Sequence, residues 1–252
     1  MTTNMSSDEA RRRVIFALDV GESREEALLW VRRLKGHVGL FKVGKEAFTL
    51  HGPPLVEAIH AEGGSVFLDL KFHDIPNTVA RASEAACRLG VEMFNLHASG
   101  GKKMMSEAIG AVRDRCQTVN RPLPVVLAVT ILTSLDDADL DILGFRYGSD
   151  EMVVRLATLA AEAGMGGVVC SPRDIAAVRR VCGPRFVIVT PGVRGMATIA
   201  GDDQKRILSP REAMTLGADY IVVGRPIRTA PDPVREADAI VEEVAAGLAS
   251  RG

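Results

Sequence analysis

The sequence predicts an α/β fold, a single-domain (β/α)8 TIM barrel, on the basis of three observations. Short apolar, β-branched runs recur eight times along the 252 residues. Amphipathic segments that start with helix-capping residues separate these runs, which is the alternation expected of right-handed βαβ units. No Gly/Ser-rich linker or change of composition divides the chain, and such barrels commonly take about 250 residues. An open, doubly wound sheet is the alternative, but eight successive units favour the closed barrel.

The eight runs are almost continuously apolar, as parallel strands buried on both faces require. In chain order, we expect strands at Val14–Leu18, Val38–Val43, Ser65–Leu70, Glu92–Leu96, Pro124–Val129, Gly167–Cys170, Phe186–Val189 and Tyr220–Val223.

Helix-start signals lie between several of these runs, in the form of a capping side chain, an N1 proline or a glutamate three residues on. They are Ser23 with Glu26, Ser171 before Pro172, Ser209-Pro210 with Glu212, and Asp232 before Pro233. Residues 1–12 are expected to be a flexible N-terminal tail, and residues 13–252 to form the barrel domain.

The composition excludes several classes of protein. Lys and Arg number 31 against 32 Asp and Glu, a net charge of -1, which argues against a nucleic-acid or membrane-surface binder. The longest stretch without these charges, Pro122–Leu135, is shorter than the roughly 20 residues that span a bilayer. The N-terminus has no apolar signal segment. The four cysteines show no metal or C-x-x-C spacing, so we expect buried free thiols and a cytoplasmic protein.

Polar residues gather where the predicted strands end. The active site of such a barrel lies at the carboxyl ends of its strands. The residues at or just after these ends are Asp19, Lys42, Asp69, Lys71, His97, Thr130, Thr133, Arg194, Gly224 and Arg225.

Strands two and three carry the first candidate site. Asp69 and Lys71 are two residues apart, so an extended strand would place both on one face. Lys42 stands among apolar neighbours, and its ammonium needs partners if it is buried. Lys42, Asp69 and Lys71 would then form a row of alternating charge, which Asp74 extends. The alternative interpretation is that these residues form purely structural ion pairs, or that the Lys42 side chain extends to the barrel rim. Alternating charges at a barrel mouth can also hold an anion and donate a proton.

The ends of strands seven and eight carry a candidate phosphate site. Gly224 and Arg225 follow the last strand, where barrels often bind phosphate. Thr190–Gly195 has the proline and glycines of a shaped loop, and Met196–Arg206 is long enough to fold over a ligand. Ordinary turns also contain Gly-Arg and Pro-Gly pairs, so only the joint placement favours phosphate.

One segment of the chain resembles the signature of a known family. Asp69-Leu70-Lys71-Phe72-His73-Asp74-Ile75-Pro76-Asn77-Thr78 is similar to the signature of the orotidine 5'-phosphate decarboxylases, in their bacterial form. Shorter matching runs extend the resemblance over roughly Val14 to Ala245. They lie at Phe16–Asp19, Phe41–Gly44, Asn95–Ala98, Val129–Ser134, Thr190–Arg194 and Val223–Ile227.

The resemblance implies a homodimeric enzyme without cofactor or metal that converts orotidine 5'-monophosphate to UMP and CO₂ in de novo pyrimidine biosynthesis. By the family pattern, Lys71 protonates C6 and Asp69 lies beside the departing carboxylate. Lys42 and Asp19 hold the ribose hydroxyls and orient the charges.

The remaining site residues also come from the resemblance. Asp74, Ile75 and Thr78 reach into the partner subunit's site. Thr133 contacts the pyrimidine, and the phosphate side is held by Arg194, Gln204, Gly224 and Arg225, with Gln204 bridging between phosphate and base.

Two other functions stay open. Magnesium-dependent sugar-phosphate decarboxylases and aldolases share the D-x-K-x-x-D pattern, but typically carry an acidic residue where Lys42 stands. A non-catalytic barrel that binds a phosphate ligand would need the phosphate residues but not the row of alternating charge.

Overall fold

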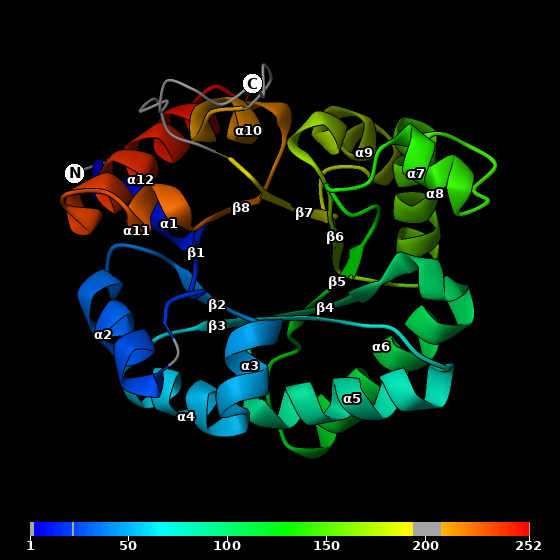
Figure 1. Cartoon of the computed structure of the whole chain (residues 1–252), viewed down its shortest axis with the longest axis horizontal. Coiled ribbons are helices and arrows are strands. Elements are labelled where there is room, and N and C mark those ends of the chain that lie inside the picture. The colour runs from blue at the N-terminus through cyan, green and yellow to red at the C-terminus, as the bar shows by residue number, and fades with distance from the viewer. Residues whose placement is uncertain (1–2, 22, 194–207, 252) are drawn as a thin grey trace. The chain divides into compact units, whose positions relative to one another are not determined.

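The computed structural model describes residues 3–21, 23–193 and 208–251 of the chain. These residues contain eight strands in the order of a closed barrel, β1 to β8 (Figure 1). The predicted (β/α)8 fold is therefore confirmed, and each strand begins and ends within two residues of its expected bounds. The strands are β1 Val14–Ala17, β2 Leu40–Gly44, β3 Val66–Phe72, β4 Met93–His97, β5 Val125–Val129, β6 Gly167–Val169, β7 Val187–Pro191 and β8 Tyr220–Val223.

Helices separate the strands along the described chain, and none of those described is long and apolar enough to cross a membrane. They are α1 Thr3–Arg12, α2 Arg24–Leu34, α3 Lys45–His51, α4 Pro53–Ala61, α5 Pro76–Leu89, α6 Gly101–Thr118, α7 Asp137–Ile142, α8 Ser149–Glu162, α9 Ile175–Cys182, α10 Pro210–Leu216, α11 Arg225–Arg228 and α12 Pro233–Ala249, with 3₁₀ turns η1 Ala98–Gly100 and η2 Pro172–Asp174.

The chain forms two compact units. The first comprises residues 1–69 and 190–252, and the second comprises residues 70–189. Both boundaries fall inside strands, β3 and β7, and not in the exposed linkers that separate domains. The division therefore does not mark two independent domains.

In the first unit, β1 is the central strand of the pairs β2–β1–β8. Ile15 pairs with Leu40 on one side and with Val222 on the other, in parallel register. Phe16 of β1 stacks on Trp30 of α2, with ring centroids 5.5 Å apart, and meets Phe41 of β2 edge to face at 6.4 Å. Aromatic burial of this kind anchors α2 against the strands.

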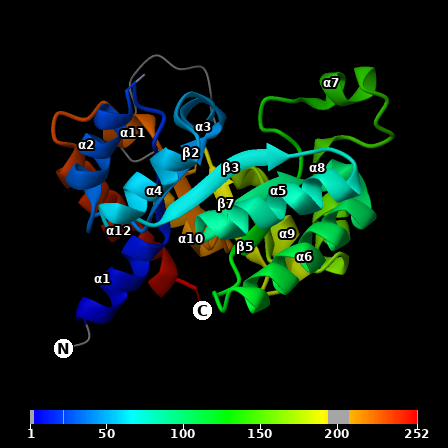
Figure 2. The same ribbon diagram turned by 90° about the horizontal axis from the view of Figure 1, so that it is seen from below.

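In the second unit, β4, β5, β6 and β7 pair in sequence and in parallel. Helices α5 and α6 run side by side, and α6 also contacts α8 (Figures 1 and 2). Met93, Phe94 and Leu96 of β4 are almost fully buried, which fits a strand covered on both faces.

The predicted helix starts are largely confirmed. Ser209 and Glu212 form a reciprocal capping box on α10, and Asp232 accepts from the N–H groups of Val234 and Arg235 at the start of α12. Ser23 accepts from the N–H of Glu26 at the start of α2. Ser171 caps the 3₁₀ turn η2, and α9 follows this turn.

The first residues differ from the expected flexible tail. Thr3–Arg12 form α1, which contacts α12, and Ala10 is fully buried. Asp8 pairs with Arg11 at 2.9 Å and Glu9 with Arg13 at 3.2 Å, spacings that stabilise a helix. Helix α1 is therefore packed through Ala10, while Asp8 and Glu9 are exposed.

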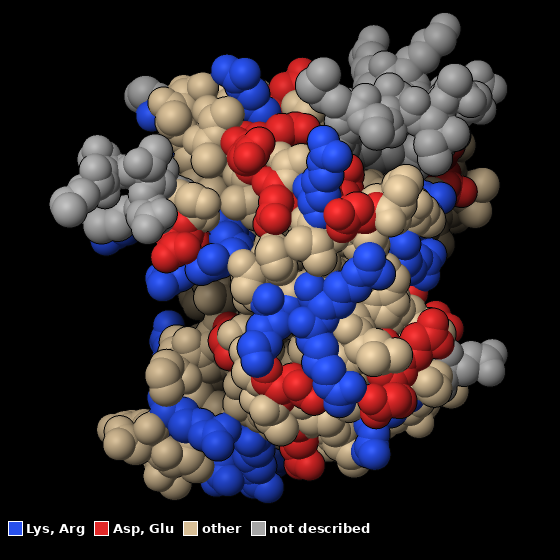
Figure 3. Space-filling model, turned by 90° about the vertical axis from the view of Figure 1, so that its left-hand side faces the viewer, with Lys and Arg blue, Asp and Glu red and all other residues tan. Residues whose placement is uncertain are grey.

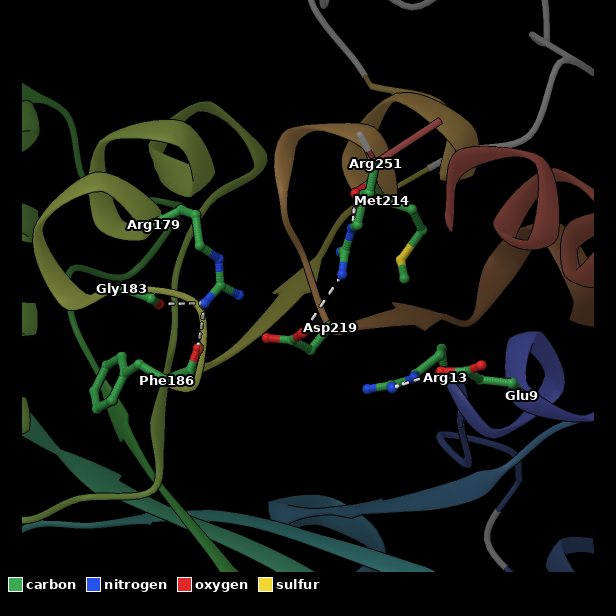
Figure 4. Close-up of polar contacts among 8 residues, drawn as sticks. All are labelled: Glu9, Arg13, Arg179, Gly183, Phe186, Met214, Asp219 and Arg251. Atoms are coloured by element: carbon green, nitrogen blue, oxygen red, sulfur yellow. Dashed lines mark hydrogen bonds and ion pairs between the residues drawn. The ribbon is translucent and has the colours of Figure 1, made fainter. Parts of the chain in front are cut away.

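Structural contacts hold residues at the amino ends of strands (Figure 4). In the first unit, Arg251 donates from Nε to the carbonyl of Met214 at 2.6 Å and pairs with Asp219, just before β8, at 3.7 Å. In the second unit, Arg179 donates to the carbonyls of Gly183 and Phe186, just before β7, at 2.7 Å each. Arginines bound to main-chain carbonyls stabilise these turns, as expected at the end of a barrel opposite the catalytic one.

Positive and negative side chains are mixed on the face of the molecule shown in Figure 3. Figure 3 shows acidic and basic side chains interspersed on the face that carries α1, α2 and α12. This distribution matches the near-zero net charge of the whole chain.

The four cysteines are free thiols, as expected, and Cys87, Cys116 and Cys170 are buried. Burial, together with the hydrogen bond between the sulfurs of Cys87 and Cys116 at 2.8 Å, raises the pKa of Cys116 to about 12. Since the thiolate is the reactive form, this thiol is unreactive near neutral pH.

The half-buried carboxyl group of Asp174 predicts a pH-dependent stability. Burial, and to a lesser degree Asp150, raises the pKa of Asp174 to about 6. The folded chain binds the Asp174 proton more tightly than the unfolded chain does, so the ionised carboxylate destabilises the folded state. This destabilisation is absent below about pH 4, where the group is protonated in both states, and reaches its full size above about pH 6. We expect Asp174→Asn to raise the unfolding free energy in urea at about pH 8 by roughly 1 kcal/mol, allowing for solvent screening.

The same comparison at about pH 4 should show no difference between Asp174→Asn and the wild-type chain. Asp137 serves as a control, because hydrogen bonds from Ser149 lower its pKa. Asp137→Asn should therefore not stabilise the protein at about pH 8. An equal gain for Asp174→Asn at both pH values would contradict burial of the charge as the cause.

Candidate active site

Three of the expected site residues meet in the first unit. Asp19 follows β1, Lys42 lies in β2, and Asp69 lies in β3. The parallel register pairs Ala17 with Lys42 and Gly44 with Asp69. Lys42 and Asp69 are thus offset by two positions across adjacent strands, which places their side chains on the same face.

The Lys42 ammonium lies between two carboxylates. Its Nζ is 3.1 Å from Oδ1 of Asp19 and 3.5 Å from Oδ2 of Asp69. The Lys42 side chain is 11% exposed and that of Asp69 13%, whereas that of Asp19 is 48% exposed. A buried ammonium is tolerated only with such partners. The sequence-based prediction that Lys42 and Asp69 come together is therefore confirmed, and Asp19 joins them.

Gly44 has no side chain and so provides the space for this cluster, a role that was not predicted from the sequence. A Cβ atom at Gly44 would lie 2.9 Å from Nζ of Lys42 and 3.0 Å from Oδ1 of Asp19. A side chain at this position would therefore push the ion pair apart. The glycine that closes Phe41-Lys42-Val43-Gly44 was a signal for this role.

Arg228 is a second residue that the sequence reasoning missed. Its Nη1 donates to the main-chain carbonyl of Asp19. The contact joins α11 to the segment after β1 and fixes the backbone that carries the Asp19 carboxylate. Nothing in the local sequence distinguishes this arginine from a surface residue.

Of the expected phosphate residues, Gly224 and Arg225 are described. They follow β8 directly, and Arg225 is the exposed first residue of α11. A Cβ at Gly224 would lie 3.1 Å from that of Ala17, so the glycine permits close approach to β1. Arg194 and Gln204, with the loop Met196–Arg206, lie outside the described residues.

Lys71 lies near the end of β3 and belongs to the second unit. Its backbone is left-handed, with φ of 54°, a region that costs a residue with a Cβ about 1–2 kcal/mol. Its N–H donates to Oδ1 of Asn95 at 2.7 Å, and Asn95 is fully buried in β4. The alternation of faces that predicted the direction of Lys71 assumes an extended strand, so it does not apply at this residue.

The rings of His73 and His97 lie beside the same strand ends, with centroids 5.4 Å apart. Asp74, Ile75 and Thr78 follow and are exposed in the single chain, Ile75 by 66%. Oδ1 of Asp74 accepts from the N–H of Ile75 at 2.6 Å, which holds this turn ahead of α5. Thr133 is exposed in the turn after β5.

In the part of the chain that the structure describes, no group of three or more His, Cys, Asp or Glu side chains is placed to hold a metal ion. The cluster at the strand ends of the first unit instead combines the Lys42 ammonium with the carboxylates of Asp19 and Asp69. The next cation along the chain after Asp69 is Lys71.

The strand order and the charged residues at the ends of β1, β2 and β3 define the class, a (β/α)8-barrel enzyme. The model of the "Orotidine 5'-phosphate decarboxylase / HUMPS family" matches residues 12–240. The chain therefore belongs to this family. The match begins at the last residue of α1, so most of that helix lies outside the family pattern.

Individual relatives carry the first of these two names. The orotidine 5'-phosphate decarboxylase of Syntrophus aciditrophicus is 56% identical over 100% of both chains. That of Trichlorobacter lovleyi is 54% identical over 97% of this chain and 100% of its own. A crystal structure of the Lactobacillus acidophilus orotidine 5'-phosphate decarboxylase covers 92% of this chain and 99% of its own, with 34% identity and a TM-score of 0.79.

Proposed function

We infer that this chain is a carboxy-lyase that converts orotidine 5'-monophosphate to UMP and CO₂, a step of de novo pyrimidine biosynthesis. Full-length relatives with 52–56% identity bear the name of that activity. The observation that carries the inference is the Lys42 ammonium held between Asp19 and Asp69. A sugar-phosphate enzyme that binds magnesium would place an acidic side chain where Lys42 stands.

Lys71 is the proposed proton donor. Departure of CO₂ leaves an electron pair at C6, in the plane of the pyrimidine ring, where no π-system delocalises it. An ammonium fixed near C6 stabilises that charge and then transfers a proton to it. The C6–carboxylate bond breaks, the new C–H bond forms, and Lys71 is left as a neutral amine that regains a proton from solvent.

The neighbouring charges have separate proposed roles. Asp69 lies beside the departing carboxylate, and Lys42 with Asp19 binds the ribose hydroxyls. Because Lys42 is already paired with both carboxylates, its position is fixed before substrate arrives. Such preorganisation lets charged groups act without rearranging during the reaction.

We propose that residues at other strand ends bind the phosphate and the pyrimidine of the nucleotide. Arg225 and Gly224, with Arg194 and Gln204, are proposed to hold the phosphate, and Thr133 the pyrimidine. A planar guanidinium such as that of Arg225 suits bidentate recognition of phosphate oxygens. Binding energy at the phosphate, far from C6, can contribute to the chemical step.

A homodimer with shared sites is part of the proposal. The exposure of Asp74, Ile75 and Thr78 in the single chain is consistent with a role in the partner subunit's site. The buried free thiols fit a reducing compartment, and we propose the cytoplasm.

The test is the fall in absorbance as purified protein acts on orotidine 5'-monophosphate, with and without EDTA. We expect the same rate in both, since Lys71 supplies the electrophilic assistance. A strict requirement for magnesium, with turnover of a sugar phosphate instead, would support the rival decarboxylase or aldolase. Tight UMP binding without any turnover would support a non-catalytic phosphate-binding barrel.

A further inference from the structure

The backbone at Lys71 is unusual among the described residues. Apart from glycines, only Lys71 and Asn120 have a positive φ there, 54° and 50°. Asparagine tolerates the left-handed region because its short amide bonds locally, and Asn120 lies in the turn after α6. Lysine has no such compensation. Something outside the residue must therefore hold Lys71 in this conformation.

The side chain of Asn95 supplies such a hold. The N–H of Lys71 donates to Oδ1 of Asn95 at 2.7 Å, a short and direct hydrogen bond. Asn95 is the middle residue of β4 and is fully buried, one of few buried polar side chains in the described chain. A buried amide packed in a strand interior cannot move away, so it presents a fixed acceptor to Lys71.

The direction of the lysine side chain depends on this contact. The left-handed φ sets where the Cα–Cβ bond leaves the strand, and hence where the ammonium can reach. Loss of the Oδ1 acceptor removes an interaction that opposes relaxation of the Lys71 backbone toward the extended φ of its neighbours in β3, and such relaxation would turn the side chain away. The hydrogen bond to Asn95 thus helps to hold Lys71 in its strained backbone conformation, and such strain is often found at functional residues.

We propose that Asn95 is a positioning residue that aims the Lys71 ammonium by holding its backbone in the left-handed conformation. The proposal rests on the function of Lys71 as proton donor proposed above. Asn95 acts through the main chain of Lys71 and needs no contact with substrate. It should therefore affect proton transfer and charge stabilisation at C6 while leaving nucleotide binding almost unchanged.

The experiment compares kcat and KM of wild-type protein and Asn95→Ala with orotidine 5'-monophosphate, together with Kd for UMP. We expect kcat to fall about 10²-fold, the cost of misplacing a catalytic group by about 1 Å. KM and the Kd for UMP should stay within about threefold of wild type. Unchanged kcat, or a loss confined to KM, would overturn the proposal.

Two further variants test the same proposal if Asn95→Ala does not fold. Asn95→Asp keeps an acceptor oxygen at the same distance from the backbone, whereas Asn95→Ser is too short to reach Lys71. We expect kcat of Asn95→Asp to exceed that of Asn95→Ser by about tenfold, a rescue that a purely structural role would not give. Equal kcat values in the two variants would contradict the proposal.

Two controls separate positioning from loss of stability. Ser83 is fully buried in α5 and donates to the carbonyl of Val79 at 2.8 Å, so Ser83→Ala also removes one buried hydrogen bond. Asn120→Ala places a less tolerant residue at the other left-handed position. Both should lower the melting temperature without lowering kcat, and a matching fall in kcat would assign the Asn95 effect to stability. Wild-type protein that fails to convert orotidine 5'-monophosphate would refute the proposed function instead.

Discussion

Lys71→Ala should remove turnover of orotidine 5'-monophosphate while leaving UMP binding nearly intact. We expect kcat to fall by at least about 10⁴-fold, because the substitution removes both the proton donor and the positive charge near C6. UMP carries no carboxylate at C6, so its binding does not depend on the lysine as the transition state does. Absorbance assays for turnover and titration calorimetry for UMP binding measure the two effects separately.

Lys102 provides the matched control for this variant. It is also a lysine of the second unit, but its exposed side chain pairs with Glu162 at 3.0 Å. Lys102→Ala should retain wild-type kcat, since an exposed pair contributes little. Turnover by Lys71→Ala comparable to that of wild type would remove Lys71 from the role of proton donor.

Mixing two inactive variants should restore activity if the sites are shared between subunits. Lys71→Ala and Asp74→Ala each damage every site of their own homodimer. In a hybrid dimer, one site combines the intact Lys71 of one chain with the intact Asp74 of the other. After random exchange of an equal mixture, half of the dimers are hybrids with one intact site, so about a quarter of wild-type activity should return.

Subunit exchange must be verified in the same mixture, for example by energy transfer between labelled chains. Each variant alone, incubated identically, should remain inactive. Verified exchange without recovery would show that Asp74 acts within its own subunit. The exposure of Asp74 and Ile75 would then need another explanation.

The fold could be predicted from the sequence because its strands are buried on both faces. Such strands appear in the sequence as continuous apolar runs. The strand Tyr220–Val223, for example, was predicted with its observed bounds. One strand end shifted because β3 continues past the apolar run and the charged Lys71 to Phe72. The helix Thr3–Arg12 was not recognised, because the family resemblance starts only after it, at about Val14.

The site was predictable where it depends on strand spacing and not where it depends on backbone geometry. Lys42 and Asp69 came together because register and the period of two determine which side chains are neighbours. The left-handed φ of Lys71 and its bond to Asn95 follow from tertiary structure. The contact of Arg228 with the carbonyl of Asp19 joins residues far apart in the chain, beyond the reach of any local pattern.

The central claim is that this barrel decarboxylates orotidine 5'-monophosphate through its own side chains. The most direct test is to quantify UMP and CO₂ formed from that substrate by purified protein in the presence of EDTA. We expect equal amounts of UMP and CO₂, with continued turnover. Absence of UMP, or its formation only after a metal ion is restored, would contradict it.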